Sequence, residues 1–324
     1  NREWVVGPQL GDFRDRLRPL ADRLVRRTSD LDPADLDEDA AALGPLLAMT
    51  KRRILNRHGG AMLPSALDRE IGEKAFVLAL GGGGGCGYVH LGAFTLFHSL
   101  GLAPRLIAGS SMGSILGLFR ARETHFRTAL VRAVTHGLSF KKLFRVLDAE
   151  TRYGIPGTLR LYLRTALERF FVRDDGQTLR IRDLAIPFIC VVTGVRREAV
   201  RNVARYEQIF AREMRHGALR RLLHLRDLVR DGASFLTELA GTAGALKPIA
   251  LGLDTETREF DTLDAVGFSS ALPAVIQYDV TRDDPRMHEM IRVTMEKNGV
   301  DHFADGGLVA NVPARFAWEY VQAG

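Results

Sequence analysis

The stretch LIAGSSMG at residues 106–113 decides how this 324-residue chain is interpreted. Three apolar residues precede glycines at 109 and 113, which flank Ser111, and helix-forming residues begin at Ser114. A strand, a sharp turn and a helix in this order form a Gly-x-Ser-x-Gly elbow, which holds the serine hydroxyl out at a helix N-terminus. We therefore predict that Ser111 is a nucleophile and that Gly109 and Gly113 permit the turn. Alone the pattern is weak, because Gly and Ser also meet by chance in loops.

A run of five glycines at 81–85 lies about one strand and one helix upstream of the elbow. It closes the strand-like segment 75–80 and opens the helix-like segment 87–100. Glycines adopt unusual backbone dihedrals and let several N–H groups point toward one anion. The run therefore predicts a site for negative charge.

Three kinds of anion site compete for this run. A P-loop ends in Gly-Lys-Ser/Thr, whereas Gly85 is followed by Cys86 and Gly87, so we set that kind aside. The Gly-x-Gly-x-x-Gly spacing of a dinucleotide site is present, but the next strand ends at 108–110 without the acid that binds a ribose. The third kind is an oxyanion hole, whose donors stabilise the oxygen formed when a serine attacks an ester. The candidate donors are the N–H groups of Gly82, Gly83, Gly84 and Gly85.

A serine nucleophile needs a base, which is usually a histidine. None of the nine histidines has a distinctive setting, although His90 follows the glycine run by about one helical turn and His302 lies just ahead of an Asp-Gly-Gly. Asp305 is the better candidate. It ends a short apolar stretch and precedes Gly306 and Gly307, so it projects from a strand end, where active residues of α/β sheets gather. The alternative is a plain turn residue, because Asp-Gly is a common turn pair.

Three blocks in this order resemble the signature of the patatin-like phospholipases. They are GGGGCGYVHLG at 82–92, GSSMG at 109–113 and DGG at 305–307. The shorter sequences RDLAIP at 182–187, SSALP at 269–273 and NVP at 311–313 also resemble landmarks of that family. The resemblance spans roughly 75–320. It is strongest to the lysophospholipase branch, because of the Leu-Gly-Gly-Gly-Gly run and the Ser-Met-Gly-Ser sequence of the elbow.

The resemblance implies a Ser–Asp dyad, in which Ser111 attacks an acyl ester and Asp305 is its base without a histidine. It also implies a glycine-rich oxyanion hole, a phospholipid or lysophospholipid substrate, and no metal or other cofactor. One position departs from the family pattern: Cys86 stands where Arg or Lys is usual in the glycine block. We expect Cys86 to be a small buried residue rather than a reactive thiol.

Composition and charge limit which binding partners and which cellular compartment we expect. The 46% apolar content is ample for a large α/β core, and two cysteines give no disulfide framework, which fits a reducing compartment. Without a long apolar run or a secretory signal, we expect a cytoplasmic protein with peripheral membrane contact; export independent of a signal stays open. The net charge of +6 favours anionic surfaces in general. No zinc spacing, helix-turn-helix pattern or aromatic platform points to nucleic acid. The oligomeric state is open.

Two regions outside the motifs are expected to be helical. Residues 1–72 read as a separate helical N-terminal region, in which Pro33 opens one helix and Asp32 caps it. Within the catalytic domain, predicted at 73–324, residues 201–250 read as a basic amphipathic helical insertion, a candidate lid or membrane-contact segment. An ordinary packed helix with solvated arginines explains that segment about equally well.

We predict a three-layer α/β/α fold with a mostly parallel central sheet, a helical N-terminal extension and a helical lid insertion. The predicted function is release of fatty acid from a phospholipid or lysophospholipid. One alternative, a neutral-lipid or general esterase, would use the same residues. The other is a catalytically silent membrane-binding module, which would fit the departure at Cys86.

Overall fold

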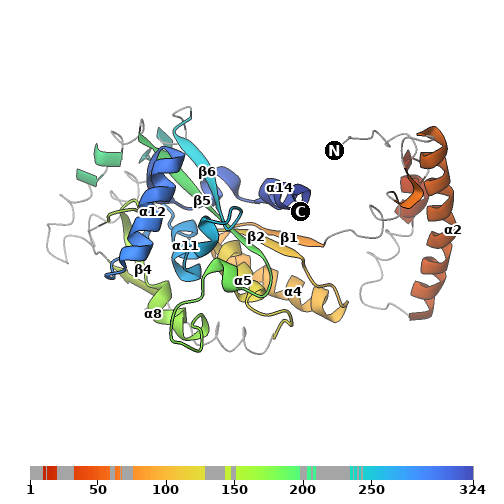
Figure 1. Ribbon diagram of the computed structural model, residues 1–324, viewed down its shortest axis with the longest axis horizontal. Helices are drawn as coiled ribbons and strands as arrows, with labels where there is room; N and C mark the ends of the chain where they lie inside the picture. Colours follow the sequence, from red (N-terminus) through yellow and green to blue (C-terminus); the bar gives the residue numbers. More distant parts are fainter. Residues whose placement is uncertain are drawn as a thin grey trace. The chain divides into compact units, whose positions relative to one another are not determined.

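In the computed structural model, residues 1–74 form one compact unit and residues 75–324 form a second (Figure 1). The residues that the structure describes are 10–11, 13–19, 33–58, 63–65, 67, 76–127, 143–146, 151–197, 203–205, 207–208, 234–235, 237–238, 241 and 244–323. Most of the predicted insertion at 201–250, including its basic part at 211–230, lies outside them.

The first unit is built around the helix α2 (Pro33–Arg57). This helix begins at Pro33 as predicted, because proline at the first helical position needs no N–H partner and its φ is already helical. The predicted cap Asp32 lies outside the described residues. Leu46, Ile54 and Leu67 are buried in this unit.

The second unit contains two sheets. Its strands are β1 (Val77–Leu80), β2 (Leu106–Ser110), β3 (Phe144–Val146), β4 (Gly157–Leu161), β5 (Phe188–Arg196), β6 (Leu246–Leu251), β7 (Ala274–Gln277) and β8 (Val300–Ala304). The main sheet has the order β1-β2-β5-β6, with β8 also paired to β5. Strands β1, β2 and β5 run parallel, and β6 and β8 run antiparallel to β5. A smaller sheet, β3-β4-β7, was not foreseen from the sequence.

Helices connect and cover these strands. The longer ones are α4 (Val89–Ser99), α5 (Met112–Ala121), α11 (Thr262–Ser269), α12 (Pro285–Asn298) and α14 (Ala314–Ala323). The short ones are η1 (Gly84–Tyr88), α8 (Leu163–Leu167), η2 (Glu168–Phe170), η3 (Ile181–Asp183), η5 (Thr257–Glu259) and α13 (Gly307–Ala310).

Alternate residues of the central strands pack into different layers. Ile107 and Cys190 face the core beneath α4, α5 and α11, whereas Ala108 and Val191 face α14 through Ala317. Figure 1 shows α14 and β1 side by side, although they lie near opposite ends of the sequence of this unit. The fold is thus the predicted three-layer α/β/α arrangement around a mixed sheet whose first three strands are parallel.

One boundary of the predicted helical insertion is wrong. Residues 246–250 belong to β6, which pairs along β5 at the edge of the main sheet. Pro248 obscured this strand in the sequence, because proline cannot donate to a sheet ladder. An edge strand tolerates it, since only one side of the strand is paired.

Candidate active site

Two strand ends meet at the centre of the main sheet. Strand β2 pairs with the first half of β5 and ends with Ser110 opposite Val191. Strand β8 runs the other way along the second half of β5 and ends with Ala304 opposite Thr193. Because β6 occupies the other edge of β5, β2 and β8 approach head to head on the same edge. The residues that follow them, Ser111 and Asp305, are therefore brought together.

Ser111 occupies a strained turn between β2 and α5. Its φ of 52° and ψ of −129° are unusual for a residue with a side chain, and such strain is concentrated at functional sites. The flanking glycines are needed because the backbone comes very close. A Cβ on Gly109 would lie 2.6 Å from the Cα of Ser114, and one on Gly113 would lie 2.3 Å from the carbonyl oxygen of Leu80. Strand β2, the sharp turn at Ser111 and helix α5 thus follow one another directly.

The Ser111 hydroxyl donates a hydrogen bond of 2.6 Å to Oδ2 of Asp305. The other carboxylate oxygen, Oδ1, accepts the N–H of Gly307 at 2.7 Å, which orients the carboxyl group. The backbone of Asp305 is fixed as well. Its N–H donates to the carbonyl oxygen of Ala271, and its carbonyl oxygen accepts the hydroxyl of Thr193. A Cβ on Gly306 would lie 2.0 Å from the carbonyl oxygen of Val191, so only glycine fits there.

The histidines considered as bases lie elsewhere. The Nε2 atom of His90 is 3.1 Å from the carbonyl oxygen of Gly81, and that of His302 is 3.7 Å from a carboxylate oxygen of Glu207. Among the residues that the structure describes, Asp305 is the only side chain hydrogen-bonded to the Ser111 hydroxyl. Within the same part of the chain, no group of His, Cys, Asp and Glu is placed to hold a metal ion.

Burial changes the acidity of Asp305. The residue is only 6% exposed, and removal of its carboxyl group from water raises its pKa above the ordinary value. The hydrogen bonds from Ser111 and Gly307 oppose this shift without cancelling it. A raised pKa makes the carboxylate a stronger base than an aspartate in water, which is what proton removal from a serine requires.

The run of glycines at 81–85, called the glycine loop below, lies against Ser111. One N–H group of this loop already donates hydrogen bonds to Asn311. Gly82 donates to both the side-chain oxygen of Asn311, at 3.1 Å, and its carbonyl oxygen, at 3.3 Å. A Cβ on Gly82 would lie 2.8 Å from that of Ser111. Gly82 therefore ties the loop to Asn311 instead of offering a free donor as predicted. Gly83 caps η1, and Gly84 and Gly85 begin it, so their N–H groups have no acceptor within the helix.

The two cysteines differ in exposure. Cys86, directly after the glycine loop, is exposed, so the expectation that it is buried was wrong. Residues 83–86 are all exposed, so a short side chain there has little to pack against. Cys190 lies under the elbow and is fully buried, which raises the pKa of its thiol to about 12.

Ser269, at the end of α11, connects the two halves of the site. Its hydroxyl accepts the N–H of Ser111 at 3.0 Å and donates to the carbonyl of Val191 at 2.6 Å. Its own carbonyl accepts the N–H of Gly306 at 3.1 Å. The sequence analysis identified SSALP at 269–273 and NVP at 311–313 as family landmarks, but it assigned no role to Ser269 or Asn311. Neither motif carries a local signal of the distant residue that it contacts.

Helix α11 is itself anchored by buried charges. The carboxylate of Asp264 is fully buried and accepts hydrogen bonds from Tyr278, Arg282 and Arg164. Burial and the Asp264 charge raise the pKa of Tyr278, so that its hydroxyl stays a donor. The far end of α11 is thereby held while its other end supports the elbow.

We expect Ser269→Ala to lower kcat for ester hydrolysis by about 10- to 100-fold, because the strained Ser111 backbone loses its acceptor and small displacements of a nucleophile are costly. KM for a short soluble ester should change little. Ser270→Ala is the matched control: its hydroxyl is buried, one residue further on, and without a partner among the described residues. Equal losses of kcat in both variants would show that Ser269 has only a packing role.

Comparison with known proteins identifies the family of the chain. The sequence model of the patatin-like phospholipases matches residues 78–318. The chain is 29% identical over 137 residues to human Patatin-like phospholipase domain-containing protein 6, a match that covers 42% of this chain and 10% of that protein. It is 27% identical over 129 residues to Lysophospholipase NTE1 of Mycosarcoma maydis, covering 40% of this chain and 7% of that protein. The chain thus spans about a tenth or less of these relatives. It belongs to the patatin-like phospholipase family, a family of lipid acyl hydrolases.

Proposed function

We propose that this chain is a serine hydrolase that releases fatty acid from a phospholipid or lysophospholipid through a Ser111–Asp305 dyad. The observation that carries the proposal is the 2.6 Å hydrogen bond from the Ser111 hydroxyl to a buried, oriented carboxylate. The strained elbow and the adjacent glycine loop support the same chemistry.

In the first half of the reaction, Oγ of Ser111 attacks the acyl carbonyl carbon while its proton passes to Oδ2 of Asp305. The oxyanion that forms is stabilised by N–H groups of Gly83 and Gly84 and by the positive N-terminus of α5. The intermediate collapses, the alcohol leaves with the proton held by Asp305, and the acyl group stays on Ser111. In the second half, Asp305 takes a proton from water, whose oxygen attacks the acyl-serine. When this second intermediate collapses, the bond from the acyl carbon to Oγ breaks, the proton passes from Asp305 to Oγ of Ser111, and the fatty acid is released.

Family membership and the name of the fungal relative support a phospholipid or lysophospholipid as the substrate class. A neutral-lipid esterase would use the same dyad and differ in the surroundings of the acyl chains. The silent membrane-binding alternative is less well supported, because a module without catalysis has no use for a serine paired with a buried carboxylate.

Peripheral contact with an anionic membrane completes the proposal. The basic residues at 201–230, which lie mostly outside the described part of the chain, would supply attraction to anionic headgroups. No described helix has both the length and the apolar character needed to cross a bilayer.

The test is labelling of the full chain with a fluorophosphonate probe, followed by fatty-acid release from three substrates. We expect one covalent adduct, on Ser111, and faster release from lysophosphatidylcholine or phosphatidylcholine than from triacylglycerol. A folded chain that fails to react with the probe would support the silent module. Preferential release from triacylglycerol would support the neutral-lipid esterase.

A further inference from the structure

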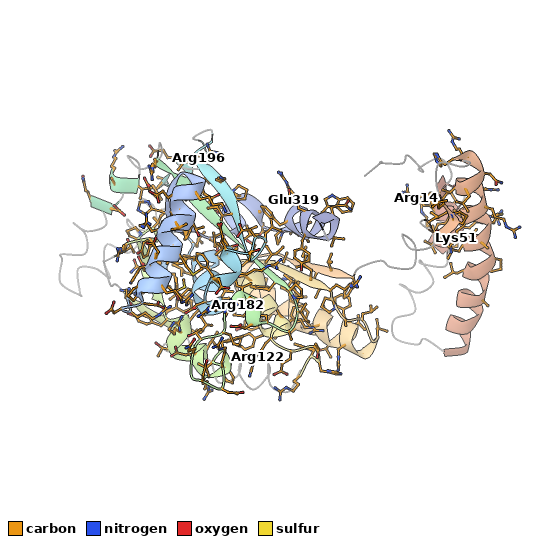
Figure 2. The ribbon with its side chains drawn as sticks, in the orientation of Figure 1. Arg14, Lys51, Arg122, Arg182, Arg196 and Glu319 are labelled. Atoms are coloured by element: carbon orange, nitrogen blue, oxygen red, sulfur yellow. The ribbon has the colours of Figure 1, made fainter. Side chains whose placement is uncertain are left out.

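A long tract beside the active site contains no charged residue. Residues 75–104 include no Asp, Glu, Lys or Arg, although 26% of the chain is charged and about eight such residues would be expected in a tract of this length. The tract comprises β1, the glycine loop, η1 and α4. Charged side chains appear at the surface elsewhere in this unit, as Arg182, Arg196 and Glu319 show (Figure 2).

The inner face of α4 accounts for only part of this composition. Phe94 is buried and packs edge-on against Phe126, with ring centroids 5.5 Å apart. Phe97 packs in the same way against Phe76, at 5.0 Å. These contacts attach α4 to the core, and an ordinary surface helix would carry polar or charged residues on its other side.

The outer side of α4 has no Asp, Glu, Lys or Arg and exposes an apolar stripe beside the polar residues Thr95, His98 and Ser99. Val89, Leu96 and Leu100 are 72%, 56% and 62% exposed. Their spacing of seven and four residues puts them on one stripe of the helix and its C-terminal cap. By contrast, the exposed face of α12 carries Arg292, which forms salt bridges with Glu289 and Glu296. A helix that packs one apolar face on the core and exposes a second apolar stripe offers that stripe to a further partner.

The stripe continues toward the active site. Helix α4 begins where η1 ends, and η1 begins in the glycine loop that lies against Ser111. Near the start of that loop, Val312 is 58% exposed, and its Cγ2 atom lies 3.1 Å from the position of a Cβ on Gly81. Exposed apolar side chains therefore lie near the start of the loop, at Val312, and directly after η1, at Val89. Figure 1 places α4 at the edge of this unit.

We propose that the outer face of α4, formed by Val89, Leu96 and Leu100, inserts into the surface of a phospholipid bilayer or micelle and holds the glycine loop against it. This inference rests on the proposed function, because it supplies the route by which an acyl ester reaches Ser111. At about 1.5 Å per residue, the 11-residue helix is too short to span a bilayer, so it lies in the interface.

The charge pattern favours lipid over a protein partner. A protein interface normally carries a polar rim with hydrogen bonds, whereas insertion among acyl chains excludes charge. The absence of charge also means that this face would bind lipid differently from the basic segment at 201–230. Binding through α4 does not require anionic headgroups and is only weakly sensitive to salt, whereas binding through arginines requires both anionic lipid and low salt.

The test uses the full chain and phosphatidylcholine vesicles at 0.5 M NaCl, with cosedimentation as the measure of binding. We expect the double variant Leu96→Glu/Leu100→Glu to reduce partitioning by at least about tenfold, because two apolar side chains are lost from the bilayer and two charges oppose insertion. Hydrolysis of a soluble short-chain ester should stay within about twofold of wild type, which shows that the variant is folded. Val293→Glu is the matched control, since Val293 is an exposed apolar residue on α12.

Three outcomes would overturn the docking proposal. They are undiminished vesicle binding by the double variant, wild-type binding restricted to anionic vesicles at low salt, and light scattering that shows a dimer converted to a monomer by the double variant. The last outcome would assign the face to a second copy of the chain. Repeating the binding measurement with Ser111→Ala separates the two proposals, because docking does not depend on the nucleophile. A wild-type chain that binds vesicles but hydrolyses no ester would refute the proposed function alone.

Discussion

Ser111→Ala is expected to reduce ester hydrolysis on the order of 10⁴-fold or more, because the acyl-enzyme can no longer form. Binding groups and oxyanion donors would leave only a small residual rate above the uncatalysed reaction. The measurement is kcat/KM on a soluble ester, with fluorophosphonate labelling as an independent readout. Labelling should disappear completely.

The fold of this variant should be intact, because the alanine keeps the Cβ and loses only the hydroxyl. Ser110→Ala is a suitable control, since its hydroxyl is buried beside the elbow and has no partner among the described residues. Substantial turnover or labelling in Ser111→Ala would mean that another residue is the nucleophile.

The second large effect is expected for Asp305→Asn. The amide keeps the shape of the carboxyl group but cannot take the Ser111 proton, so we expect kcat to fall on the order of 10² to 10⁴-fold. KM should change less, because Asp305 lies behind the nucleophile and not among the groups proposed to bind the oxyanion. Retention of full kcat would exclude Asp305 as the base.

The same substitution is expected to preserve or raise the thermal stability at pH 8. Burial raises the pKa of Asp305 in the folded chain, so its contribution to stability is full below the unfolded pKa and is lost as the pH rises through the folded pKa. At pH 8 the wild type therefore carries the cost of an ionised buried carboxylate, which the neutral amide avoids. The difference in Tm should shrink toward pH 4; a markedly lower Tm at pH 8 would show that the carboxylate is needed for folding.

The pH–rate profile of the wild type follows from the same shift. A general base works when deprotonated, so kcat/KM should fall as the pH decreases through the pKa of Asp305. Because burial raises that pKa, the fall should occur above the value of about 3.9 typical of an exposed aspartate. Activity that persists undiminished to pH 4 would contradict the burial argument.

Features that depend on neighbouring residues were predictable from the sequence. The elbow at 109–113 is a strand, a turn and a helix within a few residues, and its glycines mark the close backbone approach directly. The position of Asp305 at the end of an apolar strand was equally readable. The family match at 78–318 and the three-layer fold confirm what the three sequence blocks indicated together.

Features that depend on contacts between distant segments were missed. Ser269 reaches Ser111 across 158 positions, and Asn311 reaches Gly82 across 229. The end of the predicted insertion is a strand because β5 offers a free edge to it, which no local pattern could show. Exposure of Cys86 likewise depends on how the glycine loop leaves the sheet.

The amino-acid sequence alone predicted the turn at Ser111, the glycine loop and the candidate carboxylate, because each depends on steric rules that act over a few residues. Their assembly required the three-dimensional fold. Strand β8 runs antiparallel to β5 and meets β2 end to end, and this places Asp305 against Ser111 although 194 positions separate them. Pairing of strands across such distances is governed by the packing of the whole sheet, so it leaves no mark in any short stretch of residues.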